Sequence, residues 1–159
     1  MLLKLKNIDE RIRTFRSLKL ITIMVLALLG ISLAFLPLIR LYEFYISDCG
    51  GAKCSSIGEA IFLGCFIAPF IETLIFQSLV FFILSKIKFF KENKIFIVIV
   101  SAFLFSLAHN YSYIYMLNIF FHGLILEYSY LICYEKKDGF PIFTVMIIHS
   151  LYNALSIIL

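Results

Sequence analysis

Apolar residues in this chain come in long blocks separated by short polar stretches. A helix needs about 20 mainly apolar residues to cross the hydrocarbon core of a bilayer. The chain has room for five such blocks, at about 20–39, 57–84, 95–109, 115–134 and 141–159. The pattern predicts an all-α protein, a polytopic transmembrane helical bundle with about five membrane spans.

The predicted spans divide the chain into three parts. Residues 1–19 form an amphipathic cytoplasmic leader, residues 20–56 form the first span and an outer loop, and residues 57–159 form a core of four spans. Pro37 lies near the end of the first span, where we expect the helix to bend or end. Pro69 lies inside the second span, where we expect a bend.

Composition supports a membrane protein. The chain is 62% hydrophobic and 15% charged, whereas a soluble domain has about 45–50% apolar and about 25% charged residues. Of the 14 Lys and Arg residues, 12 precede the first span or follow the second and fourth, and only Arg40 and Lys53 lie on the other side. Basic residues favour the cytoplasmic side, which predicts a cytoplasmic N-terminus and an outer C-terminus, as in a bacterial cytoplasmic membrane.

The basic residues do not indicate nucleic-acid binding, because no basic block is interleaved with aromatic residues that would stack on bases. Membrane lipid is therefore the expected surrounding. Cys49 and Cys54 in the outer loop would form a disulfide in an oxidising compartment, and the alternative is two unpaired thiols.

Polar side chains occur in three of the predicted spans at a similar depth. Glu72 lies 14 residues before Lys86, or ~21 Å along a helix, and His109 lies 15 residues after Lys94, or ~22 Å. His149 lies ~15 Å and Asn153 ~21 Å beyond the inner turn at 135–139. Because ionisable side chains inside a membrane are costly and usually functional, this layer is the candidate site.

Spacing within the helices refines this candidate site. His149 and Asn153 are at positions i and i+4, as are Phe105 and His109, so each pair shares a helix face. Gln77 is rotated by about 140° from Glu72 on an ideal helix, and we expect it to bond to a neighbouring helix. His122, in the fourth span, is a supporting candidate, although a lone membrane histidine more often packs or bonds between helices.

The residue types match the hydrolysis of an amide bond inside a membrane. A carboxylate in a low-dielectric cleft can act as a general base on water, a histidine can orient that water or share its proton, and an asparagine amide can donate to an oxyanion. Glu72, His109 and His149 could equally supply three zinc ligands with one open position. We expect no metal, because the motifs lack the pair of histidines at i and i+4 that helical zinc proteases carry.

Three motifs resemble those of the CAAX-protease and bacteriocin-processing (CPBP) family of intramembrane proteases. Phe105-x3-His109 and His149-x3-Asn153 match that family's Phe-x3-His and His-x3-Asn motifs, and Glu72-Thr73-x3-Gln77 aligns with its Glu-Glu-x3-Arg motif. Thr73 and Gln77 depart from the family pattern and are supporting residues in this chain. The resemblance covers residues 57–159.

The resemblance implies a glutamate-type intramembrane endopeptidase. Glu72 and His109 would activate water, and His149 and Asn153 would stabilise the oxyanion. The layer estimate places the site at or beyond the membrane midplane, which favours a membrane-anchored or exported protein or peptide as substrate. The alternatives are a non-catalytic immunity or assembly protein of the same fold, which the altered first motif favours, a zinc-dependent protease, and an ion or proton carrier.

Overall fold

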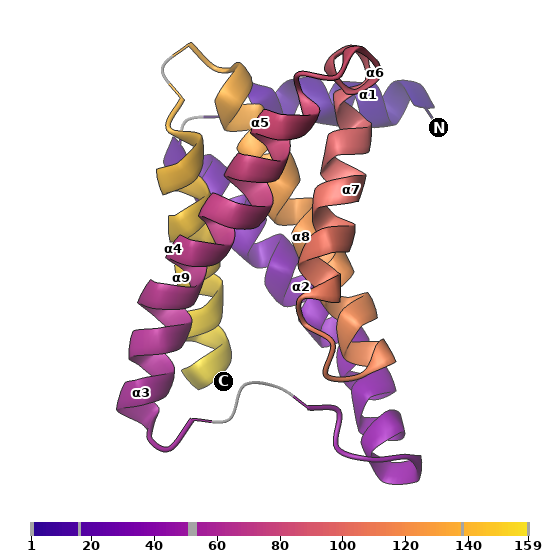
Figure 1. Cartoon of the computed structure of the whole chain (residues 1–159), viewed down its shortest axis with the longest axis vertical. Coiled ribbons are helices and arrows are strands. Elements are labelled where there is room, and N and C mark those ends of the chain that lie inside the picture. The colour runs from indigo at the N-terminus through magenta and orange to yellow at the C-terminus, as the bar shows by residue number, and fades with distance from the viewer. Residues whose placement is uncertain (1, 16, 51–53, 138, 159) are drawn as a thin grey trace.

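The computed structural model describes residues 2–15, 17–50, 54–137 and 139–158. Every regular element within these ranges is a helix, which confirms the predicted all-α class. A short helix, α1 (Leu2–Arg13), lies across one end of the bundle, and the longer helices run away from it (Figure 1). Four residues assigned above to the leader, the outer loop and the last span lie outside the described residues: Met1, Arg16, Lys53 and Leu159.

The remaining elements follow in chain order. They are α2 (Ser17–Tyr45), α3 (Ile57–Phe62), η1 (Leu63–Ile67), α4 (Ala68–Glu72), η2 (Thr73–Leu79), α5 (Val80–Leu84), α6 (Lys88–Glu92), α7 (Lys94–Leu107), α8 (Tyr113–Glu135) and α9 (Pro141–Ile158). The elements from α3 to α5 form one continuous helical segment over residues 57–84, in which η1 and η2 are π-helical turns.

Four helical segments are long and apolar enough to cross a membrane: Ser17–Tyr45, Ile57–Leu84, Tyr113–Glu135 and Pro141–Ile158. The third predicted span is shorter than expected, because α7 has 14 residues and ends at Leu107. A helix of that length rises about 21 Å, less than the ~30 Å hydrocarbon core. His109 therefore lies in a turn just beyond α7 rather than at the end of a full span.

The first span is longer than predicted. Pro37 lies inside α2, which continues to Tyr45. The helix therefore does not end at Pro37, and the expectation of an end there is wrong. The physical reason is that apolar surroundings favour intrahelical hydrogen bonding on both sides of a proline. In the loop that follows, Cys49 and Cys54 are free thiols, and Cys49 is buried with its Sγ 3.3 Å from the Ser112 hydroxyl.

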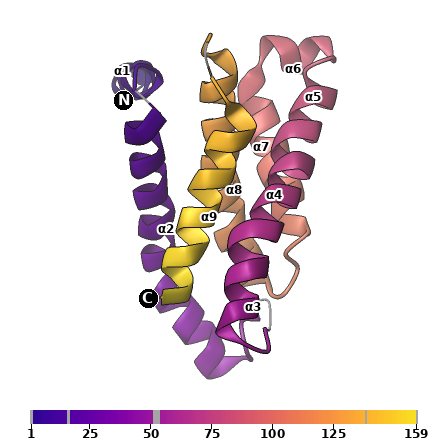
Figure 2. The same ribbon diagram turned by 90° about the vertical axis from the view of Figure 1, so that its left-hand side faces the viewer.

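Helix α8 lies at the centre of the bundle and packs against α2, α7 and α9. Its contact with α7 is close, because a Cβ added at Gly123 would lie 2.9 Å from the Ala102 Cα. Small residues permit such close approach in membrane helix pairs. Helix α9 lies between α2 and the segment 57–84 (Figure 2), and this arrangement brings the motifs on α4, α7 and α9 to one side of α8.

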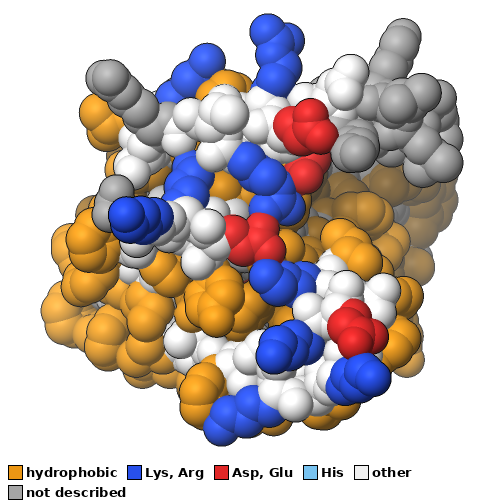
Figure 3. Space-filling model, turned by 90° about the horizontal axis from the view of Figure 1, so that it is seen from above, with side chains coloured by type: hydrophobic (Ala, Val, Ile, Leu, Met, Phe, Trp, Pro, Cys, Tyr) orange, Lys and Arg blue, Asp and Glu red, His pale blue; other side chains and the backbone are white. Residues whose placement is uncertain are grey.

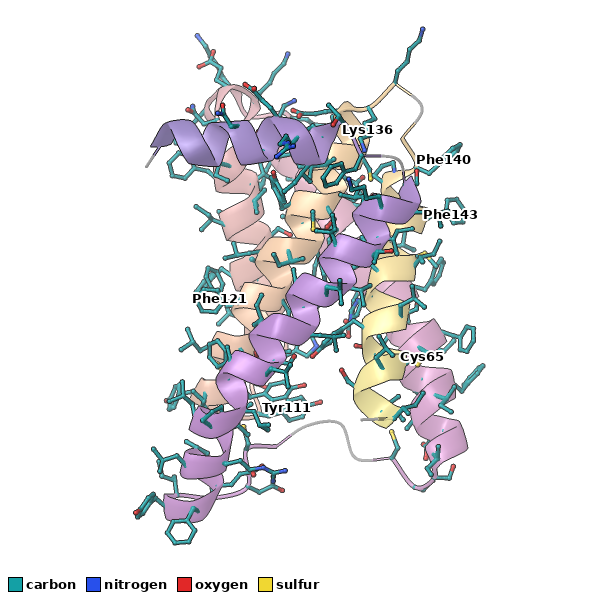
Figure 4. The ribbon with its side chains drawn as sticks, turned by 180° about the vertical axis from the view of Figure 1, so that it is seen from behind. Cys65, Tyr111, Phe121, Lys136, Phe140 and Phe143 are labelled. Carbon is teal, nitrogen blue, oxygen red and sulfur yellow. The ribbon has the colours of Figure 1, made fainter. Side chains whose placement is uncertain are left out.

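The outer surface of the bundle is apolar, as contact with lipid requires. Phe140 and Phe143 point away from the helices (Figure 4) and are 69% and 64% exposed. Lys and Arg side chains gather instead over the end that carries α1 and α6 (Figure 3). The two ends of the bundle therefore differ in charge, in the sense that the positive-inside rule predicts.

Polar contacts attach α1 to this basic end. Arg13 bonds to Asp9 and pairs with Glu135, and the Lys136 ammonium donates to the Phe15 carbonyl at 2.8 Å. Burial raises the pKa of Asp9, but hydrogen bonds from Arg13 and Tyr128 outweigh it and hold that pKa below its usual value. The amphipathic leader is thus held against the bundle by charge-assisted hydrogen bonds.

Candidate active site

Glu72 lies where a regular helix changes to a π-helical turn. It is the last residue of α4 and precedes η2 directly. Within η2 the Val80 N–H bonds to the Ile75 carbonyl, five residues back, which widens the turn. The Glu72 side chain, 21% exposed, faces a cavity between the helices.

Two histidines from other elements face the same carboxylate. The Nε2 atom of His109 lies 3.6 Å from Oε1 of Glu72, and the Nε2 atom of His149 lies 3.7 Å from Oε2. These distances exceed those of direct hydrogen bonds, and a water or substrate atom beside either pair can bond to both of its members. The structure therefore brings together three residues that the sequence analysis had placed at one depth on separate helices.

The orientation of His109 is set by the helix before it. Its Nδ1 atom lies 2.8 Å from the Phe105 carbonyl, and because a carbonyl can only accept, Nδ1 carries the hydrogen. In the neutral imidazole, Nε2 is then an acceptor that faces Glu72. The Phe105 ring lies 4.6 Å from the His109 ring and 6.0 Å from that of His149, so one aromatic side chain packs against both histidines.

Asn153 lines the cavity one helical turn after His149. Its Nδ2 donates to the Gly64 carbonyl in η1 at 2.6 Å, which joins α9 to the segment that carries Glu72. An asparagine amide has two N–H donors, so one remains for another acceptor. The Nδ1 atom of His149 is buried and has no hydrogen-bond partner among the described residues.

The cavity has a volume of about 560 Å³ and a largely apolar wall. Tyr111 and Cys54, which lie in the loops at the end opposite α1, form part of its lining. Figure 4 shows Tyr111 toward that end, far from Lys136 at the α1 end. The cavity therefore lies in the half of the bundle away from the basic residues, and the described residues that line it include no Lys or Arg.

His122 also lines the cavity, in a second polar cluster that includes residues from α2 and α9. The Ser32 hydroxyl lies 3.0 Å from His122 Nε2 and 2.7 Å from the Tyr152 hydroxyl, and His122 Nδ1 bonds to the Asn118 carbonyl. The sequence analysis missed Ser32, Tyr152 and Asn118. Asn118 could have been found from its spacing, because it lies four residues before His122 on the same predicted helix. Nothing in the sequence pairs Ser32 with His122 or Tyr152.

Thr73 and Gln77 do not line this cavity. Both side chains are fully buried on η2, and none of their polar side-chain atoms has a hydrogen-bond partner in the described part of the chain. The expected bond from Gln77 to a neighbouring helix is therefore absent, and that prediction is wrong. The Ser101 hydroxyl on α7 donates to the main-chain carbonyl of Phe76, the residue before Gln77, and not to the Gln77 side chain.

The potential for metal binding follows from the side chains that converge. In the described part of the chain, no three His, Cys, Asp or Glu side chains form a group arranged to hold a metal ion. The Glu72 carboxylate is approached by two imidazoles, by His109 at Oε1 and by His149 at Oε2. This arrangement lets a small polar molecule in the cavity hydrogen-bond to the carboxylate and to an imidazole at the same time.

The fold and the site define a class of protein: a polytopic helical membrane protein with a carboxylate and two imidazoles facing one cavity inside the bundle. The chain belongs to the family described as Type II CAAX prenyl endopeptidase Rce1-like, which matches residues 57–155. The resemblance carried by the three motifs is thereby confirmed at the level of the family. No match was found among curated proteins or among solved structures.

Proposed function

We propose that this protein is an intramembrane endopeptidase that hydrolyses a peptide bond with water activated by Glu72. One observation carries the proposal: two imidazole Nε2 atoms lie 3.6 and 3.7 Å from the two oxygens of a carboxylate inside a membrane bundle. A charged group at such a depth is costly and is normally retained for function. Membership of a protease family supports the same reaction.

The chemistry follows from the hydrogen-bonding capacity of the groups. The Glu72 carboxylate and the neutral His109 Nε2 are both acceptors, so a water between them donates one hydrogen to each. The water oxygen then attacks the carbonyl carbon while Glu72 takes its proton. When the C–N bond breaks, that proton passes to the leaving amine, which leaves a carboxylic acid and an amine as products.

The developing oxyanion needs a donor on the other side of the scissile carbonyl. The free N–H of the Asn153 amide is the donor we propose, with His149 beside it. The hydrogen bond from Asn153 to Gly64 fixes the amide before substrate binds. Such preorganised donors stabilise the transition state more than the ground state.

The substrate we propose is an uncharged segment of a membrane-anchored or exported protein. The apolar wall without Lys or Arg supports an apolar peptide. The position of the cavity, away from the basic end, supports entry from the outer half of the membrane, with a cytoplasmic N-terminus and an outer C-terminus. The mechanism needs no metal, which the absence of a His pair at i and i+4 supports.

The test compares protein termini in cells that carry wild-type protein or Glu72→Gln, mapped by mass spectrometry. We expect at least one membrane or secreted protein to be cut only in wild-type cells, because glutamine cannot take a proton from water. Glu59→Gln is the matched control, since Glu59 lies on α3 and does not line the cavity. Identical termini at equal expression would reject proteolysis and favour a non-catalytic immunity or assembly protein of the same fold.

A further inference from the structure

A second glutamate lies inside the membrane bundle, and the proposed reaction does not use it. Glu127 is on α8, its side chain is fully buried, and it does not line the site cavity. Oε2 lies 3.0 Å from the Ser101 hydroxyl, and within the ranges that the structure describes Oε1 has no hydrogen-bond partner. Among the described residues it has no cationic partner, so an ionised Glu127 would be an uncompensated buried charge.

Counting hydrogens decides the state of this side chain. The Ser101 hydroxyl has a single hydrogen, and its oxygen lies 2.5 Å from the Phe76 carbonyl as well as 3.0 Å from Glu127. A carbonyl only accepts, so the Ser101 hydrogen goes to Phe76. With that hydrogen on the Phe76 carbonyl, a full hydrogen bond between Ser101 and Glu127 requires Glu127 to be the donor, as a neutral carboxylic acid.

The carbonyl that receives this chain of hydrogen bonds belongs to the π-helical turn η2. In a regular helix the Phe76 carbonyl would accept from the Val80 N–H, but that N–H contacts Ile75 and Gln77 instead. The Ser101 hydroxyl occupies the acceptor thus released. Hydrogen bonding from α8 through α7 to η2 therefore stabilises a turn geometry that a regular helix would not keep.

The same turn adjoins the candidate site on two sides. It begins directly after Glu72, and the Phe76 ring lies 5.5 Å from the Phe105 ring, which packs against His109. We propose that Glu127 is a membrane-buried carboxylic acid that donates to Ser101, and that it thereby positions the π-helical turn that directly follows Glu72. Its effect on catalysis rests on the proposed function, whereas its protonation does not.

Infrared spectroscopy of the purified protein at neutral pH tests the protonation directly. We expect a C=O band of a buried carboxylic acid that Glu127→Gln removes and that shifts in Ser101→Ala, where the acceptor of its hydrogen is lost. Glu92→Gln on α6 is the control, because Glu92 is exposed. A band that survives in Glu127→Gln, or no such band in wild type, would overturn the proposal whether or not the protein is a protease.

Cleavage kinetics test the positioning role once a substrate is identified. Glu127→Leu should lower kcat by roughly 10- to 100-fold with little change in KM, because a misplaced Glu72 loses near-attack geometry. Glu127→Gln, whose amide N–H can donate to Ser101, should recover most of that loss. If Glu127→Gln is as inactive as Glu127→Leu while wild type cleaves, the carboxyl itself is needed and the positioning role is wrong.

Discussion

At the scale of the residue, a few hydrogen-bond donors decide what the candidate site can do. His109 uses its Nδ1 hydrogen on the Phe105 carbonyl and turns an acceptor toward Glu72. Two acceptors 3.6 Å apart do not attract each other, but both attract a water. While His109 is neutral, the pair is therefore arranged to accept two hydrogens from one water molecule.

Asn153 offers the first prediction at this scale. Asn153→Ala removes the amide that we propose as the oxyanion donor, and kcat should fall roughly 10²- to 10³-fold. The measurement is the rate of cleavage of the substrate found with the Glu72→Gln comparison.

Ser150→Ala is the matched control, because Ser150 is on the same helix beside His149 but does not line the cavity. Thermal unfolding of each variant separates loss of the Gly64 hydrogen bond from loss of catalysis. A kcat of Asn153→Ala equal to that of wild type would show that another group stabilises the oxyanion.

At the scale of the element, α7 packs closely on α8 and ends just before the turn that contains His109. Gly123 lies against Ala102 with no room for a side chain, since an added Cβ would lie 2.9 Å from the Ala102 Cα and 3.2 Å from the Ala102 carbonyl oxygen. Backbone atoms cannot move aside as the end of a flexible side chain can. Any enlargement at Gly123 therefore moves one helix relative to the other.

We expect Gly123→Ala to lower the free energy of unfolding by about 1–3 kcal/mol, the usual range for overpacking in a dense core. The measurement is unfolding of the detergent-solubilised protein by heat or denaturant. Gly30→Ala on α2 makes the same chemical change where nothing lies within 4 Å of the added Cβ. It should leave stability unchanged or raise it by up to about 1 kcal/mol, as helix propensity favours alanine. Equal effects of the two changes would contradict the packing argument.

At the scale of the whole molecule, charge and cavity are placed at opposite ends. The basic side chains cover the end with α1 and α6 (Figure 3), and Cys54 and Tyr111 line the cavity toward the other end. If the basic end is cytoplasmic, the cavity lies nearer the outer face. The orientation of the chain therefore determines which substrates can reach Glu72.

Thiol labelling of intact cells tests this orientation. Cys54 is an exposed free thiol, so a membrane-impermeant maleimide should label it from outside, and Cys54→Ser should abolish the label. Lys88→Cys on α6, made in the Cys54→Ser background, should be labelled only after the cells are opened. Labelling of Lys88→Cys in intact cells would reverse the proposed topology.

The sequence alone determined the helices and the depth of the polar residues. A backbone in lipid must satisfy its own hydrogen bonds, so long apolar blocks have little choice but to form helices. The rise of a helix then converts residue numbers into depth, which placed Glu72, His109 and His149 together. The predicted ends of the helices were less accurate, because local turns and packing decide where a helix stops. Helix α7 ends at Leu107, and α2 continues past Pro37.

Only the tertiary structure decided which polar atoms meet. A π-helical turn changes the angle between successive side chains around the helix axis. The angle expected between Glu72 and Gln77 on an ideal α-helix therefore did not predict the surroundings of Gln77. An isolated glutamate in an apolar run marks a candidate, but sequence does not say whether it faces water, a cation or a hydroxyl. Glu72 faces two imidazoles and a cavity, whereas Glu127 faces one serine in a closed interior. Their neighbours come from other helices, and only folding sets those contacts.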